Sequence, residues 1–187
     1  QSRSSAASDV YKRQEGDAEF LPYRENEFDI VLSQYGHMFA PRPSIVVKEL
    51  ARVLKPGGIL AFSTWPKELF MGKFFKLIES FSQPLPPEVA SPVLWGDMAI
   101  IEDRLKDHFD HIEFARDTMF APTMSPAHML KLFEKNAGPL ANLVKALADD
   151  PAKLSNLRNA ALVLIEKFFS NNFLRQDFLM TRCVKKI

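Results

Sequence analysis

The sequence is poor in glycine and cysteine and carries almost no net charge. Only 7 of its 187 residues are glycine, although there are 13 prolines. The single cysteine, Cys183, excludes an internal disulfide framework and any zinc site built from several thiolates. A formal net charge of +1 gives no long-range field that would favour DNA, RNA or an anionic membrane. No apolar run approaches the roughly 18 residues that a membrane span needs.

The remaining composition is that of an ordinary globular protein. Hydrophobic residues make up 47% of the chain and charged residues 25%, which excludes global disorder. The first segment differs, because residues 1–14 (QSRSSAASDVYKRQ) are rich in serine and have little to bury. They resemble translated adapter sequence, and we interpret them as non-native; a disordered tail and part of a transit peptide are the alternatives. We therefore expect the native domain to occupy residues 15–187.

Residues 28–65 predict a strand, a helix and a second strand. Residues 28–33 (FDIVLS) form a short apolar run with β-branched residues, typical of a strand buried on both faces. Ser44 is a candidate N-cap for a helix with apolar residues at helical spacing. Residues 55–58 (KPGG) should end this helix, and residues 59–65 (ILAFSTW) predict the next strand. This β-α-β unit is typical of a doubly wound parallel sheet.

The second half of the chain predicts more helices between two further strands. Residues 83–92 are proline-rich and should be extended. Asp97, Ser125 and Asp150 are candidate helix N-caps, the last two being followed by proline at the first helical position. Strands are expected at residues 111–120 and 177–184. The helices at about 125–170 would thus form an insertion, or lid, between the last strands.

Two short segments lie where ligands of open α/β sheets bind, at the carboxyl ends of strands. The Asp17 carboxylate could accept a hydrogen bond from an exocyclic amine, and the Ala18 N–H could donate to a ring nitrogen, which suits an adenine. A plain aspartate turn is the alternative. The expected strand at 28–33 ends in a polar run, and simple strand-end polarity is the alternative to a site there. The residues of this run are Ser33, Gln34, Tyr35 and Gly36.

Three segments in this order resemble the class I S-adenosylmethionine-dependent methyltransferases of the small-molecule type. They are GDAEFLPY (16–23), EFDIVLSQYGHMF (27–39) and ELARVLKPGGILAFSTW (49–65). The resemblance implies a Rossmann-like, doubly wound, mostly parallel α/β sheet and S-adenosyl-L-methionine as cofactor. It implies that Asp17 and Ala18 hold the adenine and that residues 33–36 face the methionyl part and the sulfonium. Residues 55–58 would be structural.

The chain departs from this family at its start. The glycine-rich loop after the family's first strand, and the acidic residue that holds the ribose, have no counterpart here. Those glycines let backbone N–H groups approach the cofactor. We therefore expect an N-terminally truncated methyltransferase domain that lacks its first strands and is inactive alone.

Other side chains are candidates for catalysis or acceptor binding. His37, just past the first predicted strand, is the best-placed base if the acceptor must lose a proton, with Tyr35 as a weaker candidate. A histidine that only shapes the pocket is the alternative for His37. The segment DHFDH (107–111) imitates a metal cluster, but its side chains should diverge at a solvated turn, so no metal is expected. Several apolar side chains could line an acceptor pocket, core packing being the alternative. They are Phe70, Met71, Phe74, Phe75, Trp95 and Phe133.

These features predict a cytoplasmic enzyme that methylates a small molecule, with no nucleic acid as partner. The alternative is a non-catalytic module whose helical insertion binds a partner protein, which the scarcity of glycine favours. An NAD-dependent oxidoreductase is a weaker third interpretation, because the sequence has no dinucleotide fingerprint.

Overall fold

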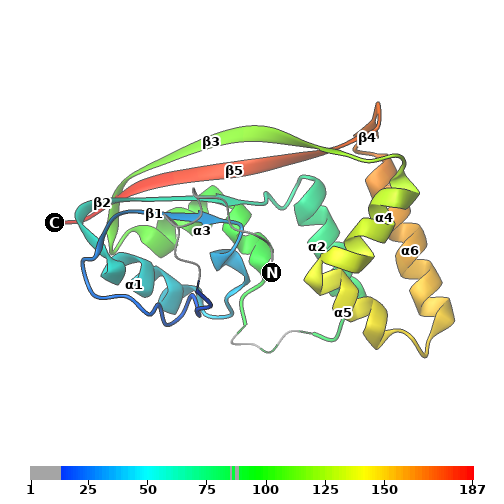
Figure 1. Cartoon of the computed structure of the whole chain (residues 1–187), viewed down its shortest axis with the longest axis horizontal. Coiled ribbons are helices and arrows are strands. Elements are labelled where there is room, and N and C mark those ends of the chain that lie inside the picture. Colours follow the sequence, from blue (N-terminus) through cyan, green and yellow to red (C-terminus); the bar gives the residue numbers. More distant parts are fainter. Residues whose placement is uncertain (1–13, 85, 87–88) are drawn as a thin grey trace, which may run out of the picture.

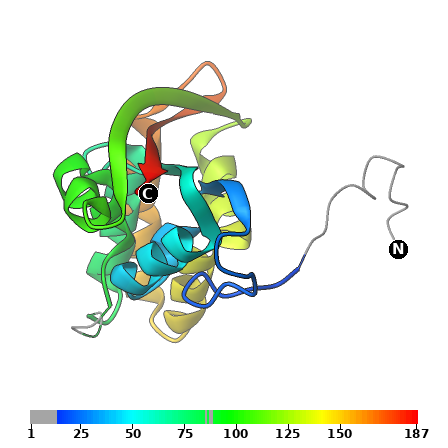
Figure 2. The same ribbon diagram turned by 90° about the vertical axis from the view of Figure 1, so that its left-hand side faces the viewer.

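The computed structural model describes residues 14–84, 86 and 89–187. The segment interpreted as non-native therefore lies outside the described residues, apart from Gln14. Figure 1 shows a twisted sheet above two groups of helices: α1 and α3 beneath β1 and β2, and α2, α4, α5 and α6 at the other end. Seen end-on in Figure 2, the β3 ribbon curves over the rest of the sheet.

The sheet is mixed, with the order β1-β2-β5-β3. Its strands are β1 (Phe28–Gln34), β2 (Leu54–Thr64), β3 (Phe109–Pro122), β4 (Phe169–Ser170) and β5 (Phe173–Lys185). β1 and β2 are parallel, whereas β5 runs antiparallel to β2, to β3 and to the short β4. The Rossmann-like α/β class is confirmed, although the sheet is mixed rather than mostly parallel. Hydrophobic periodicity marks a strand without giving its direction, and β3 and β5 pair as long antiparallel strands.

The helices agree closely with the predicted caps. They are α1 (Pro43–Val53), α2 (Phe70–Phe81), α3 (Met98–Leu105), α4 (Pro126–Asn136), α5 (Gly138–Ala146) and α6 (Pro151–Glu166), with 3₁₀ turns η2 (His37–Phe39) and η3 (Pro92–Gly96). The carboxylates of Asp97 and Asp150 and the hydroxyl of Ser125 each accept a hydrogen bond from a first-turn N–H, as N-caps do. The cap predicted at Ser44 is wrong, because α1 begins one residue earlier, at Pro43, with Arg42 at the N-cap position.

The KPGG segment belongs to β2 rather than to a separate helix stop. Helix α1 ends at Val53, and β2 begins at once with Leu54. Phe28 pairs with Leu54, but the next pair joins Ile30 to Ile59, so residues 55–58 form an irregularity in the strand. Gly57 has φ +75°, a conformation that glycine adopts without strain. The segment thus turns the chain sharply from helix into strand.

Most of the side chains predicted to line an acceptor pocket lie in the core instead. Phe70, Phe74 and Trp95 are at most 1% exposed. The Phe133 ring lies 6.1 Å from the Phe70 ring and 5.0 Å from the Phe74 ring, between centroids, so α2 and α4 share an aromatic cluster. This packing joins the inserted helices to α2.

The segment that follows β2 is held between two glycines. A Cβ atom added at Gly72 of α2 would lie 2.2 Å from the carbonyl oxygen of Pro66, and one added at Gly96 would lie 2.1 Å from that of Trp65. Real Cβ atoms do not come this close to backbone atoms, so only glycine fits at either position. The carboxyl end of β2 is therefore fixed between α2 and η3.

Candidate functional site

Two adjoining hollows lie at the carboxyl end of β1. The first has a volume of about 580 Å³ and is lined by Glu15, Gly16, Asp17, Ala18, Gly36, Phe39, Ala40 and Pro41. The second, of about 560 Å³, shares Gly16, Ala18 and Gly36 with the first. It continues along β1 from Ser33 back to Phe28. The structure therefore brings together four of the predicted cofactor residues, namely Asp17, Ala18, Ser33 and Gly36.

Asp17 lies in a local turn at the mouth of the first hollow. One carboxylate oxygen accepts a hydrogen bond from the Glu19 N–H (2.9 Å), and the Phe20 N–H donates to the Asp17 carbonyl (3.0 Å). The side chain is exposed. A carboxylate has about four acceptor sites, so the turn leaves capacity for a ligand.

A buried carboxylate that sequence reasoning missed anchors this turn. Glu19 is 8% exposed, and its two oxygens accept hydrogen bonds from the Arg42 backbone N–H (2.7 Å) and from Arg42 Nε (2.8 Å). This pair ties the Asp17–Ala18 turn to the start of α1. The only signal in the sequence is a pair of opposite charges 23 residues apart, and an acidic side chain beside Asp17 is more typical of solvent exposure.

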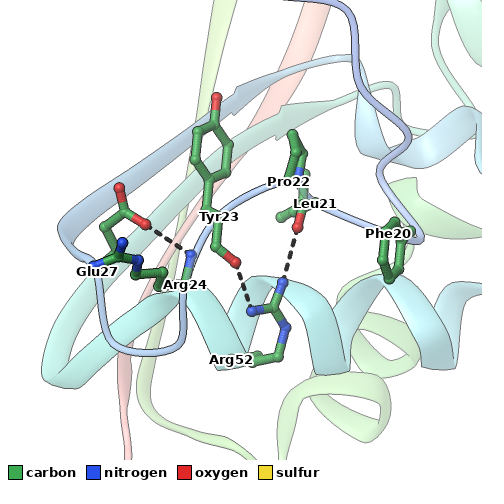
Figure 3. Close-up of a pocket in the computed structure, with 7 residues that line it drawn as sticks. All are labelled: Phe20, Leu21, Pro22, Tyr23, Arg24, Glu27 and Arg52. Atoms are coloured by element: carbon green, nitrogen blue, oxygen red, sulfur yellow. Dashed lines mark hydrogen bonds between the residues drawn. The ribbon is translucent and has the colours of Figure 1, made fainter.

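The chain after the turn is fastened to the other end of α1 (Figure 3). Arg52 donates hydrogen bonds to the carbonyl oxygens of Tyr23 (2.8 Å) and Leu21 (3.0 Å), and the Leu21 N–H donates to Glu49 (2.8 Å). A hollow of about 680 Å³ opens between these residues and Glu27. Arg52 and Glu27, which line this hollow, hold the backbone at Leu21, Tyr23 and Arg24 in place.

Ser33 and His37 form a closed hydrogen-bonded pair at the end of β1. Ser33 Oγ lies 2.8 Å from His37 Nδ1 and accepts a hydrogen bond from the His37 backbone N–H (3.2 Å). If the Ser33 hydroxyl donates its proton to Nδ1, the hydroxyl keeps one lone pair for any ligand. Ser33 is thus positioned by His37.

His37 itself is buried beneath the site. It is 3% exposed, and its ring packs edge-on against Phe62 and Trp95, each 4.5 Å away between centroids. Within the described residues, His37 Nε2 has no hydrogen-bond partner. Burial, aided by the charge of Arg104, lowers the pKa of His37 to about 4. This environment favours a neutral histidine that shapes the pocket over the predicted general base.

Tyr35 and Gln34 line neither of the two hollows. Tyr35 has φ +56°, which is uncommon for a residue with a side chain, and its ring stacks on Trp65 at 3.9 Å and 5° between planes. Burial raises the pKa of the Tyr35 phenol, which makes it a poorer base. Gln34 is exposed and lines neither hollow. Any contact of these two residues with a cofactor stays a prediction.

The described residues include neither a candidate metal cluster nor a membrane-spanning helix. Among them there is no group of three or more His, Cys, Asp or Glu side chains that could hold a metal ion. The described helices include none that is both long and apolar enough to cross a membrane.

Comparison with known sequences places the chain beside methyltransferases. The family model described as "Methyltransferase domain" matches residues 1–62. An uncharacterized protein of Mycobacterium tuberculosis (strain ATCC 25618 / H37Rv) is 30% identical over 181 residues, which are 96% of this chain and 66% of the relative. The demethylmenaquinone methyltransferase of Staphylococcus saprophyticus is 38% identical over 72 residues, covering 37% of this chain and 31% of that protein. The chain thus spans about two thirds of the length of the mycobacterial relative.

Comparison with solved structures supports the same fold. A Thermotoga maritima protein described as a SAM-dependent methyltransferase, possible histamine N-methyltransferase, matches with a TM-score of 0.50 and 18% identity. The match covers 91% of this chain and 62% of that one. The three motifs, the match to the family model and the shared α/β fold agree. The family-model match over residues 1–62, together with the shared fold, supports the class I S-adenosylmethionine-dependent methyltransferase family for this chain.

Proposed function

We propose that this chain is part of an enzyme that transfers a methyl group from S-adenosylmethionine to a small-molecule acceptor. One observation carries the proposal: the Asp17–Ala18 turn and Gly36 line a single hollow at the carboxyl end of a parallel strand. This is where open α/β sheets bind ligands.

The residues present fit one side of the donor. The Asp17 carboxylate would accept a hydrogen bond from the adenine amino group, and the Ala18 N–H would donate to a ring nitrogen. Ser33 and Gly36 line the continuation of the hollow, where the rest of the donor would lie. The bound donor supplies an electrophilic methyl group on a sulfonium.

The residues of the chain would contribute alignment rather than proton transfer. Transfer of a methyl group from a sulfonium is an in-line displacement, so the site must orient the reactants and exclude water. His37 suits this role, because a buried neutral ring holds the Ser33 hydroxyl and hence the end of β1. The anchors at Glu19 and Arg52 would hold the adenine side in the same way.

We further propose that a complete protein continues the sheet beyond β1 and supplies the glycine-rich loop. Within the described residues β1 pairs only with β2, and its side chains Ile30 and Leu32 are 56% and 75% exposed. The unpaired edge of β1 supports a further strand beside it, and the exposed apolar face at Ile30 and Leu32 supports a further element that covers this face. The cofactor site would then be completed by residues outside this chain.

Donor binding to a longer protein that contains this chain tests the proposal. We expect Asp17→Ala to weaken binding of S-adenosylmethionine, measured by calorimetry, by about 10- to 100-fold, since a charge-assisted hydrogen bond contributes roughly 1.5–3 kcal/mol. Asp29→Ala is the matched control. Asp29 pairs with Lys55 near the amino end of β1, at the opposite end of this strand from the hollow. Equal affinity of the Asp17→Ala variant and the unmodified protein would refute the adenine assignment.

A further inference from the structure

A largely apolar cavity of about 410 Å³ lies between α2, the two 3₁₀ turns and the start of α5. Its lining includes Phe39, Phe75, Ile78, Glu79, Ser91 and Pro139. Figure 1 shows α2 and α5 side by side below the sheet. The volume lies within the range of about 300–1,000 Å³ typical of small-molecule sites. Of the six aromatic and apolar side chains predicted to form an acceptor pocket, only Phe75 lines this cavity.

This cavity adjoins the proposed donor site through one side chain. Phe39 lines both the cavity and the hollow that contains Asp17 and Gly36. Its ring is 46% exposed and packs edge-on against Phe75 at 5.6 Å between centroids. A molecule in the cavity would therefore reach the donor hollow past the exposed Phe39 ring.

One carboxylate among the described lining residues is held in a fixed orientation. Glu79 is the one ionisable side chain among the described lining residues. The Ser91 hydroxyl donates a hydrogen bond to one of its carboxylate oxygens, which holds the carboxylate in place across the cavity wall. The carboxylate keeps free acceptor sites. The surroundings therefore complement a molecule with an apolar body and a cationic donor group.

We propose that this cavity binds the methyl acceptor, and that the acceptor is an amine with an apolar, aromatic-sized body. The amine is recognised by Glu79, and the body packs on Phe39, Phe75 and Ile78. This assignment rests on the proposed methyltransferase function and adds the acceptor class to it.

Binding of two matched probes to the chain tests this assignment without the donor. 4-Fluorophenethylamine and 3-(4-fluorophenyl)propionate carry the same fluorophenyl group on an amine and on an acid, and their titration is followed by ¹⁹F NMR. We expect the amine to bind at least tenfold more tightly than the acid. Glu79→Gln, which keeps an acceptor for Ser91, should weaken the amine about tenfold and leave the acid unchanged. Ser80→Ala, at an exposed position on the same helix, is the control and should change neither.

The opposite results would overturn the assignment. Equal binding of the two probes, or an amine affinity that Glu79→Gln does not change, would show that Glu79 recognises no ligand. Tighter binding of the acid would assign recognition to Lys153, which lines an adjoining hollow of about 320 Å³. Failure of both probes in a protein that still binds S-adenosylmethionine through Asp17 would refute the acceptor site alone. Loss of donor binding would instead refute the proposed function.

Discussion

Gly72→Ala should destabilise the fold, although alanine is the better helix former. The new Cβ would lie 2.2 Å from the Pro66 oxygen and 2.5 Å from the Lys67 Cα, and backbone atoms cannot rotate away. We take the upper end of the usual overpacking cost, about 3 kcal/mol, against a helix-propensity gain of about 1 kcal/mol. The free energy of unfolding should therefore fall by about 2 kcal/mol.

Gly138→Ala is the matched control, because it makes the same substitution at the start of α5. A Cβ atom there would meet no atom within 4 Å, so only the propensity gain of up to about 1 kcal/mol remains. The two variants should thus differ by about 3 kcal/mol, or by about 6–12 °C in melting temperature for a domain of this size.

Urea unfolding at 25 °C measures both variants, followed by tryptophan fluorescence and far-ultraviolet circular dichroism. The chain has two tryptophans. One of them, Trp65, lies in the segment held by Gly72 and stacks on Tyr35, so the folded Gly72→Ala variant should also show a shifted emission maximum. A Gly72→Ala variant as stable as Gly138→Ala would refute the close packing of α2 on the end of β2.

Three further predictions concern stability and reactivity. The pKa of His37 is about 4 in the folded chain and about 6.5 in the unfolded chain, so between these pH values only the unfolded chain protonates this histidine. The free energy of unfolding should therefore fall by about 2 kcal/mol from pH 7 to pH 5. Urea midpoints of a His37→Gln variant should vary less over this range, and an equally steep dependence would contradict the burial of His37. Burial raises the pKa of the Cys183 thiol to about 12, so it should not react with Ellman's reagent at pH 8 until urea unfolds the chain; prompt labelling of the folded chain would count against this. Ser125→Ala removes the N-cap of α4 and should cost about 1 kcal/mol in urea unfolding, whereas Ser80→Ala should cost nothing measurable.

Features set by neighbouring residues could be predicted from the sequence. The caps at Asp97, Ser125 and Asp150 depend on one side chain and the next helical turn, and all three are present. The apolar run at 28–33 is a strand for the same reason, but it is not buried on both faces as expected, since none of its residues is buried. The direction of β5 could not be predicted, because it depends on which strands lie beside it in the folded sheet.

The candidate site was predictable in part. Family motifs at the turn and the strand end predict Asp17, Ala18 and Gly36, which line one hollow, while their contact with a cofactor stays a prediction. The burial of His37 depends on Phe62 and Trp95, which lie far away in the sequence. The left-handed backbone of Tyr35 likewise has no local signal, since glycine, not tyrosine, is the residue expected there.

The antiparallel pairing of β3 and β5 brings the two ends of the helical insertion together. The chain leaves β3 at Pro122 and enters β5 at Phe173, and these two residues are paired neighbours. The two ends of the segment between them are therefore one strand spacing apart, about 5 Å. Related genes could therefore lengthen, shorten or exchange α4 to α6 without changing the register of the sheet. Since α5 contributes Pro139 to the proposed acceptor cavity, such exchanges would let acceptor preference evolve while the donor end of β1 stays the same.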